Sequence, residues 1–318
     1  MKYSGIGGQA VIEGIMMMKG EDYAVAVRRP DGEIEIKKDK YESITTKAKI
    51  LSLPFIRGVF RFADSMILGM KTLTYSASFF EDDEDAEPGK FEQLLDRVFG
   101  EKLESAIMAA VLVISFILAI GIFMLLPLGI ANLFKGVITS DHLMAVLEGV
   151  IRIAIFIIYI KLVSRMEDIR RTFMYHGAEH KCINCVEHGH PLTVKYVRES
   201  SKEHKRCGTS FILIVMVISI LMFMVIRVDT IWMRILSRII LVPVIAGISY
   251  EVLQCAGRSN SKFMDLVSRP GMWMQGLTTK EPDDSMIEVA IAATEAVFDW
   301  REYLTENFPG WEKQLEES

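Results

Sequence analysis

The stretch that decides the fold is Ser105–Phe134, SAIMAAVLVISFILAIGIFMLLPLGIANLF, which holds thirty residues and no Asp, Glu, Lys or Arg. A second uncharged stretch, Gly208–Ile226, adds nineteen residues. A helix needs about 20 apolar residues to cross the hydrocarbon core of a bilayer. Both stretches are therefore predicted to span a membrane, which excludes a wholly soluble enzyme.

Two further stretches, Leu143–Val163 and Ile231–Tyr250, are predicted to span as well. The first carries Glu148 and Arg152, whose spacing of four residues puts them on one helical face, where they can neutralise each other. Two arginines in the first half of the other stretch must snorkel or face protein. We expect an α-helical membrane protein with four transmembrane helices and a mixed α+β cytosolic body.

Lysine and arginine are distributed unevenly between the predicted loops. Nine of them lie in residues 164–208, whereas the loop between the first two spans holds only Lys135 and the last loop holds Arg227 with Asp229. Loops rich in positive charge stay in the cytoplasm. We therefore expect a multi-pass protein of the cell membrane, with both termini and the central loop cytosolic.

The rest of the composition excludes other classes. A net charge of −5 gives no direct nucleic-acid footprint. Four cysteines in 318 residues do not make a disulfide framework, so reduced thiols are expected. The expected partner is the lipid bilayer, and other membrane proteins or the membrane-biogenesis machinery are candidates.

The N-terminal residues are too interrupted by charge for a signal peptide and are predicted to form strands. Ala24–Val27 and Glu33–Ile36 flank Pro30-Asp31-Gly32, a turn sequence that predicts a hairpin. Ala10–Met18, interrupted by Gly14, is expected to be a third strand.

An amphipathic helix is predicted from Phe55 to about Phe80, with a polar stripe of Arg57, Arg61, Asp64 and Lys71. It is expected either in the headgroup plane or packed on another helix. A second amphipathic helix is predicted over Ser285–Tyr303. The chain is expected to divide into six regions. The cytosolic or interfacial N-terminal part contains the β element (1–48) and the first amphipathic helix with the acidic linker Glu81–Glu87 (49–104). Two spans (105–163), a His/Cys-rich cytosolic loop (164–208), two further spans (209–250) and a cytosolic helical segment (251–318) follow.

Candidate chemistry concentrates in the central loop, where five of six histidines and three of four cysteines lie between His176 and Cys207. His176 and His180, four residues apart, project from one helical face beside Glu179. This H-x-x-E-H pattern is typical of inverted zincins, in which the glutamate activates a metal-bound water. The pattern predicts a divalent metal, most simply zinc, with Glu179 as the catalytic base.

The remaining ligands are open to interpretation. A helical wheel places Glu187 on the face of the histidine pair, while His204 and Cys207 follow just before the third span. A rival arrangement joins Cys182-x-x-Cys185 to His204 and Cys207 as a closed structural zinc site. The third possibility is a loop without any metal.

Several motifs resemble the YqhQ-like bacterial membrane proteins, a family of unknown function. They are Gly7–Gly14 (GGQAVIEG), His176–Lys181 (HGAEHK), His204–Phe211 (HKRCGTSF), Pro270–Gln275 (PGMWMQ) and Thr278–Pro282 (TTKEP). The resemblance implies at most a metal-dependent enzyme. It singles out Gln9, Glu13, His176, Glu179, His180, His204 and Cys207. It includes neither Cys182 nor Cys185.

Two functions from different classes follow. The first is a cytosol-facing, metal-dependent hydrolase with His176, His180 and a third ligand, His204 or Glu187, around the metal. The second is a non-catalytic membrane adaptor in membrane-protein biogenesis or quality control, with a structural metal or none. A catalytic site keeps a coordination position open for water and a structural site is closed.

Overall fold

The structure, a computed structural model, describes residues 2–80, 103–226, 230–258 and 261–315. The acidic run Glu81–Glu87 lies outside the described residues. The chain divides into two compact units, which are described separately. The first unit comprises Met1–Phe80, Ile160–Met222 and Ile226–Ser318, and the second comprises Glu81–Tyr159 and Phe223–Val225.

A four-stranded antiparallel sheet opens the chain, with the strands side by side in sequence order. The strands are β1 (Ile6–Val11), β2 (Gly14–Lys19), β3 (Asp22–Arg28) and β4 (Ile34–Lys40). The hairpin predicted at Pro30-Asp31-Gly32 is confirmed, because β3 pairs with β4 across it. The single strand expected over Ala10–Met18 is wrong, because the chain reverses at Ile12 and Glu13 and β1 pairs with β2. Glu13 has a φ of 48° there, a turn conformation that residue alternation does not reveal.

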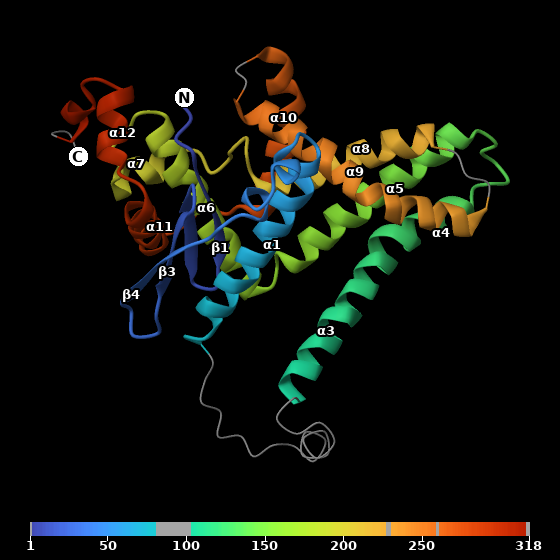
Figure 1. Cartoon of the computed structure of the whole chain (residues 1–318), viewed down its shortest axis with the longest axis horizontal. Helices are drawn as coiled ribbons and strands as arrows, with labels where there is room; N and C mark the ends of the chain where they lie inside the picture. Colours follow the sequence, from blue (N-terminus) through green and yellow to red (C-terminus); the bar gives the residue numbers. More distant parts are fainter. Residues whose placement is uncertain (1, 81–102, 227–229, 259–260, 316–318) are drawn as a thin grey trace. The chain divides into compact units, whose positions relative to one another are not determined.

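Helices cover both faces of this sheet (Figure 1). Helices α6 (Glu167–Glu187) and α11 (Asp284–Val297) lie on one face, and α1 (Ile56–Ala77) lies on the other. Ile15 and Met17 point into the core with α6 and α11, whereas Met16 packs with Leu68 of α1. Strand β2 is therefore apolar on both sides, as a covered central strand must be.

The sheet, the central loop and the C-terminal helices share one hydrophobic core, to which α7 (Val194–Glu199) and α12 (Trp300–Asn307) contribute. This confirms that these parts pack into one body. The single helix expected over Ser285–Tyr303 is wrong, since α11 ends at Val297 and α12 starts at Trp300. The side chain of Asp299 accepts hydrogen bonds from the N–H groups of Arg301 and Glu302, and this cap starts a new helix.

The described residues contain four helical stretches long and apolar enough to cross a membrane: Ala110–Asn132, Asp141–Val163, Gly208–Val225 and Ile235–Gly257. The helices that form them are α3 (Leu103–Ile120), the π-helical turn η4 (Gly121–Leu125), α4 (Leu126–Asn132), α5 (Asp141–Val163), α8 (Gly208–Val225) and α9 (Ile231–Arg258). The protein is thus mostly helical, with four candidate membrane-spanning helices and a small sheet. The fourth helix runs past the expected end at Tyr250.

The remaining helices are α10 (Lys262–Thr278) and the short 3-10 turns η1 (Ile44–Thr46), η2 (Lys49–Ser52) and η5 (Trp311–Gln314). Within the second unit, Arg152 Nη2 donates to Glu148 Oε1 at 2.6 Å and Arg152 Nε donates to the Phe123 carbonyl at 3.1 Å. The two charges therefore neutralise each other on one helix, as their spacing predicts.

Candidate metal centre

Helix α6 carries the central residues of the candidate site. Its face beside the 278–280 segment has a glycine, Gly177, where a Cβ would lie 2.1 Å from the Lys280 carbonyl oxygen. The Lys280 N–H also donates to the Phe173 carbonyl at 2.9 Å. This close approach brings the end of α10 against the turn of α6 that carries His176.

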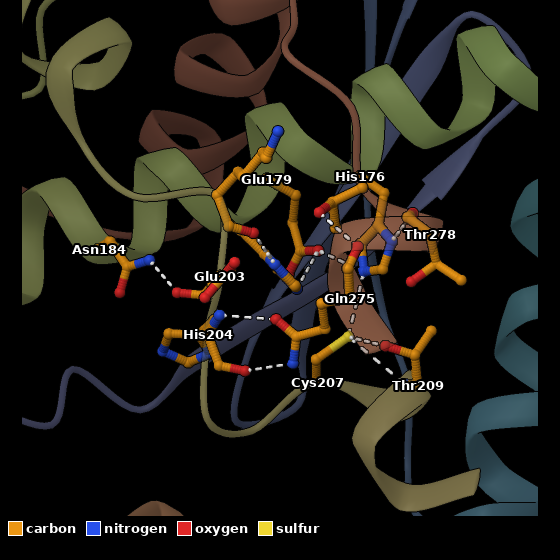
Figure 2. A network of polar contacts seen from close by, with 12 residues as sticks. His176, Glu179, Asn184, Glu203, His204, Cys207, Thr209, Gln275 and Thr278 are labelled. Carbon is orange, nitrogen blue, oxygen red and sulfur yellow. Dashed lines mark hydrogen bonds and ion pairs between the residues drawn. The ribbon is translucent and has the colours of Figure 1, made fainter. Parts of the chain in front are cut away.

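Both histidines of the pair are held through Nδ1 (Figure 2 shows the His176 contact). His176 Nδ1 lies 3.0 Å from the Thr278 carbonyl oxygen, and His180 Nδ1 lies 2.7 Å from the Lys202 carbonyl oxygen. A carbonyl oxygen only accepts hydrogen bonds, so each Nδ1 is the protonated nitrogen. Each Nε2 is left with a lone pair, which is the arrangement of metal-binding histidines.

Cys207 completes a group of three ligands. Its Sγ lies 3.2 Å from His176 Nε2, and one ligand atom from each of His176, His180 and Cys207 lies within 4.8 Å of the others. Cys207 is the N-cap of α8, where its Sγ accepts a hydrogen bond from the Thr209 N–H at 3.4 Å. This hydrogen bond holds Sγ at the start of α8, next to the histidine pair.

Glu179 lies beside the same two imidazoles. Its Oε2 is 3.9 Å from His176 Nε2 and 3.8 Å from His180 Nε2. Burial raises the pKa of this carboxyl to about 7, against the opposing effects of His176, the Gly8 backbone and Arg206. A Cβ at Gly8 would lie 2.5 Å from the Met16 carbonyl oxygen and 3.0 Å from Glu179 Cγ. Only glycine therefore lets β1 pass this close to β2 and to the Glu179 side chain.

The cluster opens onto a cavity of about 640 Å³, of which His176 and Cys207 form part of the wall. The wall also includes residues of β1, α1, α8 and α9, all in the first unit. Two of the three possible ligands are therefore reachable from a space of the size that ligand sites usually have.

Glu187 does not join this group. Its carboxylate forms an ion pair with Arg206 and accepts hydrogen bonds from the N–H and the hydroxyl of Ser4. His204 Nε2 faces Glu187 Oε2 at 3.5 Å, and neither atom has a hydrogen-bond partner among the described residues. Burial lowers the pKa of His204 to about 4 and outweighs the Glu187 carboxylate, which alone would raise that pKa. Burial alone would raise the pKa of Glu187, but His204 and Arg206 lower it to about 2.

The side chain of Gln275 holds the chain at His204, a role that the sequence analysis missed (Figure 2). Its amide accepts from the His204 N–H at 2.8 Å and donates to the His204 carbonyl at 2.7 Å. The only sequence signal for Gln275 is its place in the PGMWMQ motif. The backbone carbonyls that orient the histidines left no signal at all.

The other residues singled out by the sequence lie elsewhere. Cys182 and Cys185 are buried in the core on the other side of α6, where burial raises the pKa of both thiols. The closed zinc site that would join them to His204 and Cys207 is therefore wrong. Glu13 does not face the histidine pair, because it forms an ion pair with Arg171. Gln9 donates to Thr72 and lines the cavity.

Comparison with known proteins places these motifs in a family. Residues 53–300 match the family described as "Protein of unknown function (DUF1385)". The chain belongs to this family. It is 35% identical over 286 residues to "Uncharacterized protein YqhQ" of Bacillus subtilis (strain 168), covering 90% of this chain and 89% of that protein. The resemblance drawn from the motifs is thus confirmed, and no solved structure matches.

Proposed function

We propose that this family member is a membrane-anchored, metal-dependent hydrolase. His176, His180 and Cys207 hold one divalent transition ion, most simply zinc, and Glu179 is the general base. The observation that carries the proposal is that two imidazole Nε2 atoms, each fixed by a carbonyl on Nδ1, face the Cys207 thiol at the wall of a cavity. Three protein ligands leave a fourth position for water, which is typical of catalytic zinc.

A metal ion held by His176, His180 and Cys207 would supply Lewis acidity, which would activate a water molecule and polarise the bond to be hydrolysed. The Glu179 carboxylate lies within 4 Å of both imidazole Nε2 atoms, so it is placed to accept the proton of that water. His176 and His180 keep their ring orientation through the carbonyls of Thr278 and Lys202. His204 and Glu187, expected as third ligands, act here as supports of the loop.

The test is elemental analysis of the purified full-length protein. We expect about one zinc per chain, lost in His176→Ala/His180→Ala and in Cys207→Ser, but kept in His188→Ala, an exposed histidine just beyond α6. Glu179→Gln should keep the metal and lose hydrolysis, because it removes a base and not a ligand. Full metal content in the His176→Ala/His180→Ala protein would refute the site. A coordination shell closed by a fourth protein ligand would favour the non-catalytic adaptor.

A second candidate chemistry uses the same residues without a metal. The Cys207 thiol lies 3.2 Å from His176 Nε2, and the Thr278 carbonyl orients His176 through Nδ1, as in a cysteine nucleophile with its base. Such a dyad does not need His180. Activity that survives in His180→Ala, or in the presence of a chelator, would therefore favour the thiol over the metal.

The orientation in the cell membrane is part of the proposal, with both termini and residues 164–208 in the cytosol. It is supported by the nine Lys and Arg residues of that segment. A reporter that is active only in the cytosol, fused after Ser318, should be active. Activity of a reporter that works only outside the cytosol, fused at the same residue, would overturn the orientation.

A further inference from the structure

The cavity beside the metal cluster has a mixed lining. One part is formed by polar groups near the cluster, namely His176, Cys207 and Thr209. Most of the remaining wall is apolar and comes from α1, α6, α8 and α9: Phe62, Leu68, Phe173, Phe211, Ile212 and Leu253. A ligand that fits this lining has an apolar chain as well as a polar head.

The charge of the lining is positive. Arg61 and Arg206 both line the cavity, and Arg61 forms no ion pair with any described residue. Arg206 binds Glu187 through Nη2, while its buried Nη1 has no hydrogen-bond partner in the described part of the chain. Asp64 is the one acidic residue among the described lining residues, and its oxygens are taken by Ser43, Tyr41 and the Ile44 N–H. The cavity therefore offers an anion one guanidinium without an ion pair, that of Arg61, and one unused donor, Arg206 Nη1.

Helix α1, which forms one wall, exposes a row of large apolar side chains. Part of its polar stripe contacts protein: Asp64 is buried, Arg57 forms an ion pair with Glu251 of α9, and Lys71 forms one with Asp39 of β4. The exposed apolar stripe runs from Ile56 at the start of the helix to Leu73 and contains Phe62, Met66, Ile67 and Met70. A stripe of this size turned outward indicates contact with lipid.

The apolar stripe of α1 is continuous with a candidate membrane-spanning helix, because α1 packs along α9. A Cβ at Gly58 would lie 2.7 Å from the Tyr250 side chain, and a Cβ at Gly247 would lie 2.4 Å from the Phe55 carbonyl. Helix α10, which follows α9, also exposes Phe263, Leu266 and Trp273. Both helices therefore expose apolar side chains suited to a membrane surface, and α10 packs on the start of α8, where a Cβ at Gly271 would lie 2.7 Å from Ser210 Oγ.

Phe62 connects the two features. It lines the cavity, it contacts the Phe211 ring of α8 with 5.5 Å between ring centroids, and it lies at the border of the exposed stripe. The cavity is thus adjacent to the exposed apolar stripe of α1. We infer that the cavity binds an amphiphile with an anionic, phosphate-like headgroup taken from the bilayer, with the headgroup at Arg61 and Arg206. This names the substrate class of the hydrolase and rests on the proposed function.

The experiment measures binding of dodecyl phosphate to the full-length protein in the detergent dodecyl maltoside. The ligand and the detergent have the same alkyl chain and differ only in the headgroup. We expect Arg61→Gln to weaken binding about tenfold to a hundredfold, because a hydrogen bond to a charged group contributes about 1.5–3 kcal/mol. Arg269→Gln removes an exposed arginine of α10 outside the cavity and should leave the affinity unchanged. Ile212→Trp, which fills the cavity, should abolish binding.

Two further ligands test whether the site needs an anionic headgroup and whether it needs an alkyl chain attached to it. Dodecyltrimethylammonium should not compete with dodecyl phosphate, and inorganic phosphate should bind at least a hundredfold more weakly than the amphiphile. Equal effects of Arg61→Gln and Arg269→Gln, or equal affinity for inorganic phosphate, would overturn the inference. His180→Ala protein should lose metal and still bind dodecyl phosphate. Wild-type protein that binds dodecyl phosphate but contains no metal would refute the proposed function alone. Wild-type protein that contains metal but does not bind dodecyl phosphate would refute this inference alone.

Discussion

Two places along α6 gather buried polar side chains, and they differ in what neutralises them. At the His176 cluster, in the middle of the helix, two imidazole nitrogens, a thiol and a carboxylate face one another, and no lysine or arginine of the described residues forms an ion pair with them. At the Glu187 cluster, at the C-terminal end of the helix, the guanidinium of Arg206 already neutralises the carboxylate. A group of electron-pair donors that converge without a cation is the arrangement that a metal ion completes.

The hydrogen bonds around the two clusters differ in the same sense. Carbonyls and the N-terminus of α8 orient the His176 cluster and leave its ligand atoms directed at one another. The Glu187 cluster uses its carboxylate to hold Ser4 and Arg206, and thereby fixes the N-terminal residues to α6. The first cluster is therefore suited to binding, and the second to the stability of the fold.

The largest effect that separates the two clusters is expected from Glu187→Ala. The side chain is fully buried, and its removal leaves Arg206 without its ion-pair partner and Ser4 without an acceptor. Breaking one side of a buried pair costs about 3–5 kcal/mol. We expect that loss in the free energy of unfolding, with metal content unchanged in the folded protein. Glu199→Ala, at an exposed site on α7, is the control and should change stability little. Loss of metal at unchanged stability would mean that Glu187 is a ligand.

The sequence predicted the four long apolar helices and the proximity of His176 and His180 because both depend on local patterns. Long uncharged stretches need no tertiary information to indicate membrane helices, and a spacing of four residues fixes two side chains on one helical face. The same reasoning failed for Glu187, because a helical wheel ignores the rise along the axis. Glu187 lies seven residues beyond His180, which is about 10 Å further along α6 at about 1.5 Å per residue.

What the sequence could not predict depends on tertiary contacts between distant segments. The carbonyls of Thr278 and Lys202 orient the imidazoles through backbone atoms, which carry no residue signature. The reversal at Glu13 interrupts an apolar alternation that itself continues through the turn. The outward apolar face of α1 was visible as amphipathicity, but which side faces protein is decided by partners such as Glu251 and Asp39.

A smaller effect is expected from Cys182→Ser, which tests whether the thiols of the core are separate from the Cys207 thiol. Cys182 is fully buried among apolar side chains, and a hydroxyl there costs about 1–3 kcal/mol of stability. Metal content should stay at the wild-type value, whereas Cys207→Ser should lose it. Cys255→Ser, at an exposed cysteine of α9, should change neither quantity. Thermal unfolding and elemental analysis of the three proteins measure this, and metal loss in Cys182→Ser would restore a thiol-rich site.

The smallest effect concerns the support of Cys207 and compares two threonines. The Thr209 hydroxyl lies 3.1 Å from Cys207 Sγ, so Thr209→Val removes one polar contact to the sulfur and keeps the backbone N–H bond. Groups that support metal ligands contribute roughly tenfold in affinity, and we expect a loss at about that level in competition with a zinc chelator. Thr278→Val is the matched control, because its buried hydroxyl has no hydrogen-bond partner among the described residues while its carbonyl still holds His176. Its zinc affinity should equal that of the wild type. Equal losses in both variants would mean that the change reflects packing and not the contact between the Thr209 hydroxyl and Cys207 Sγ. That result would remove the support for Cys207 as a ligand held by α8.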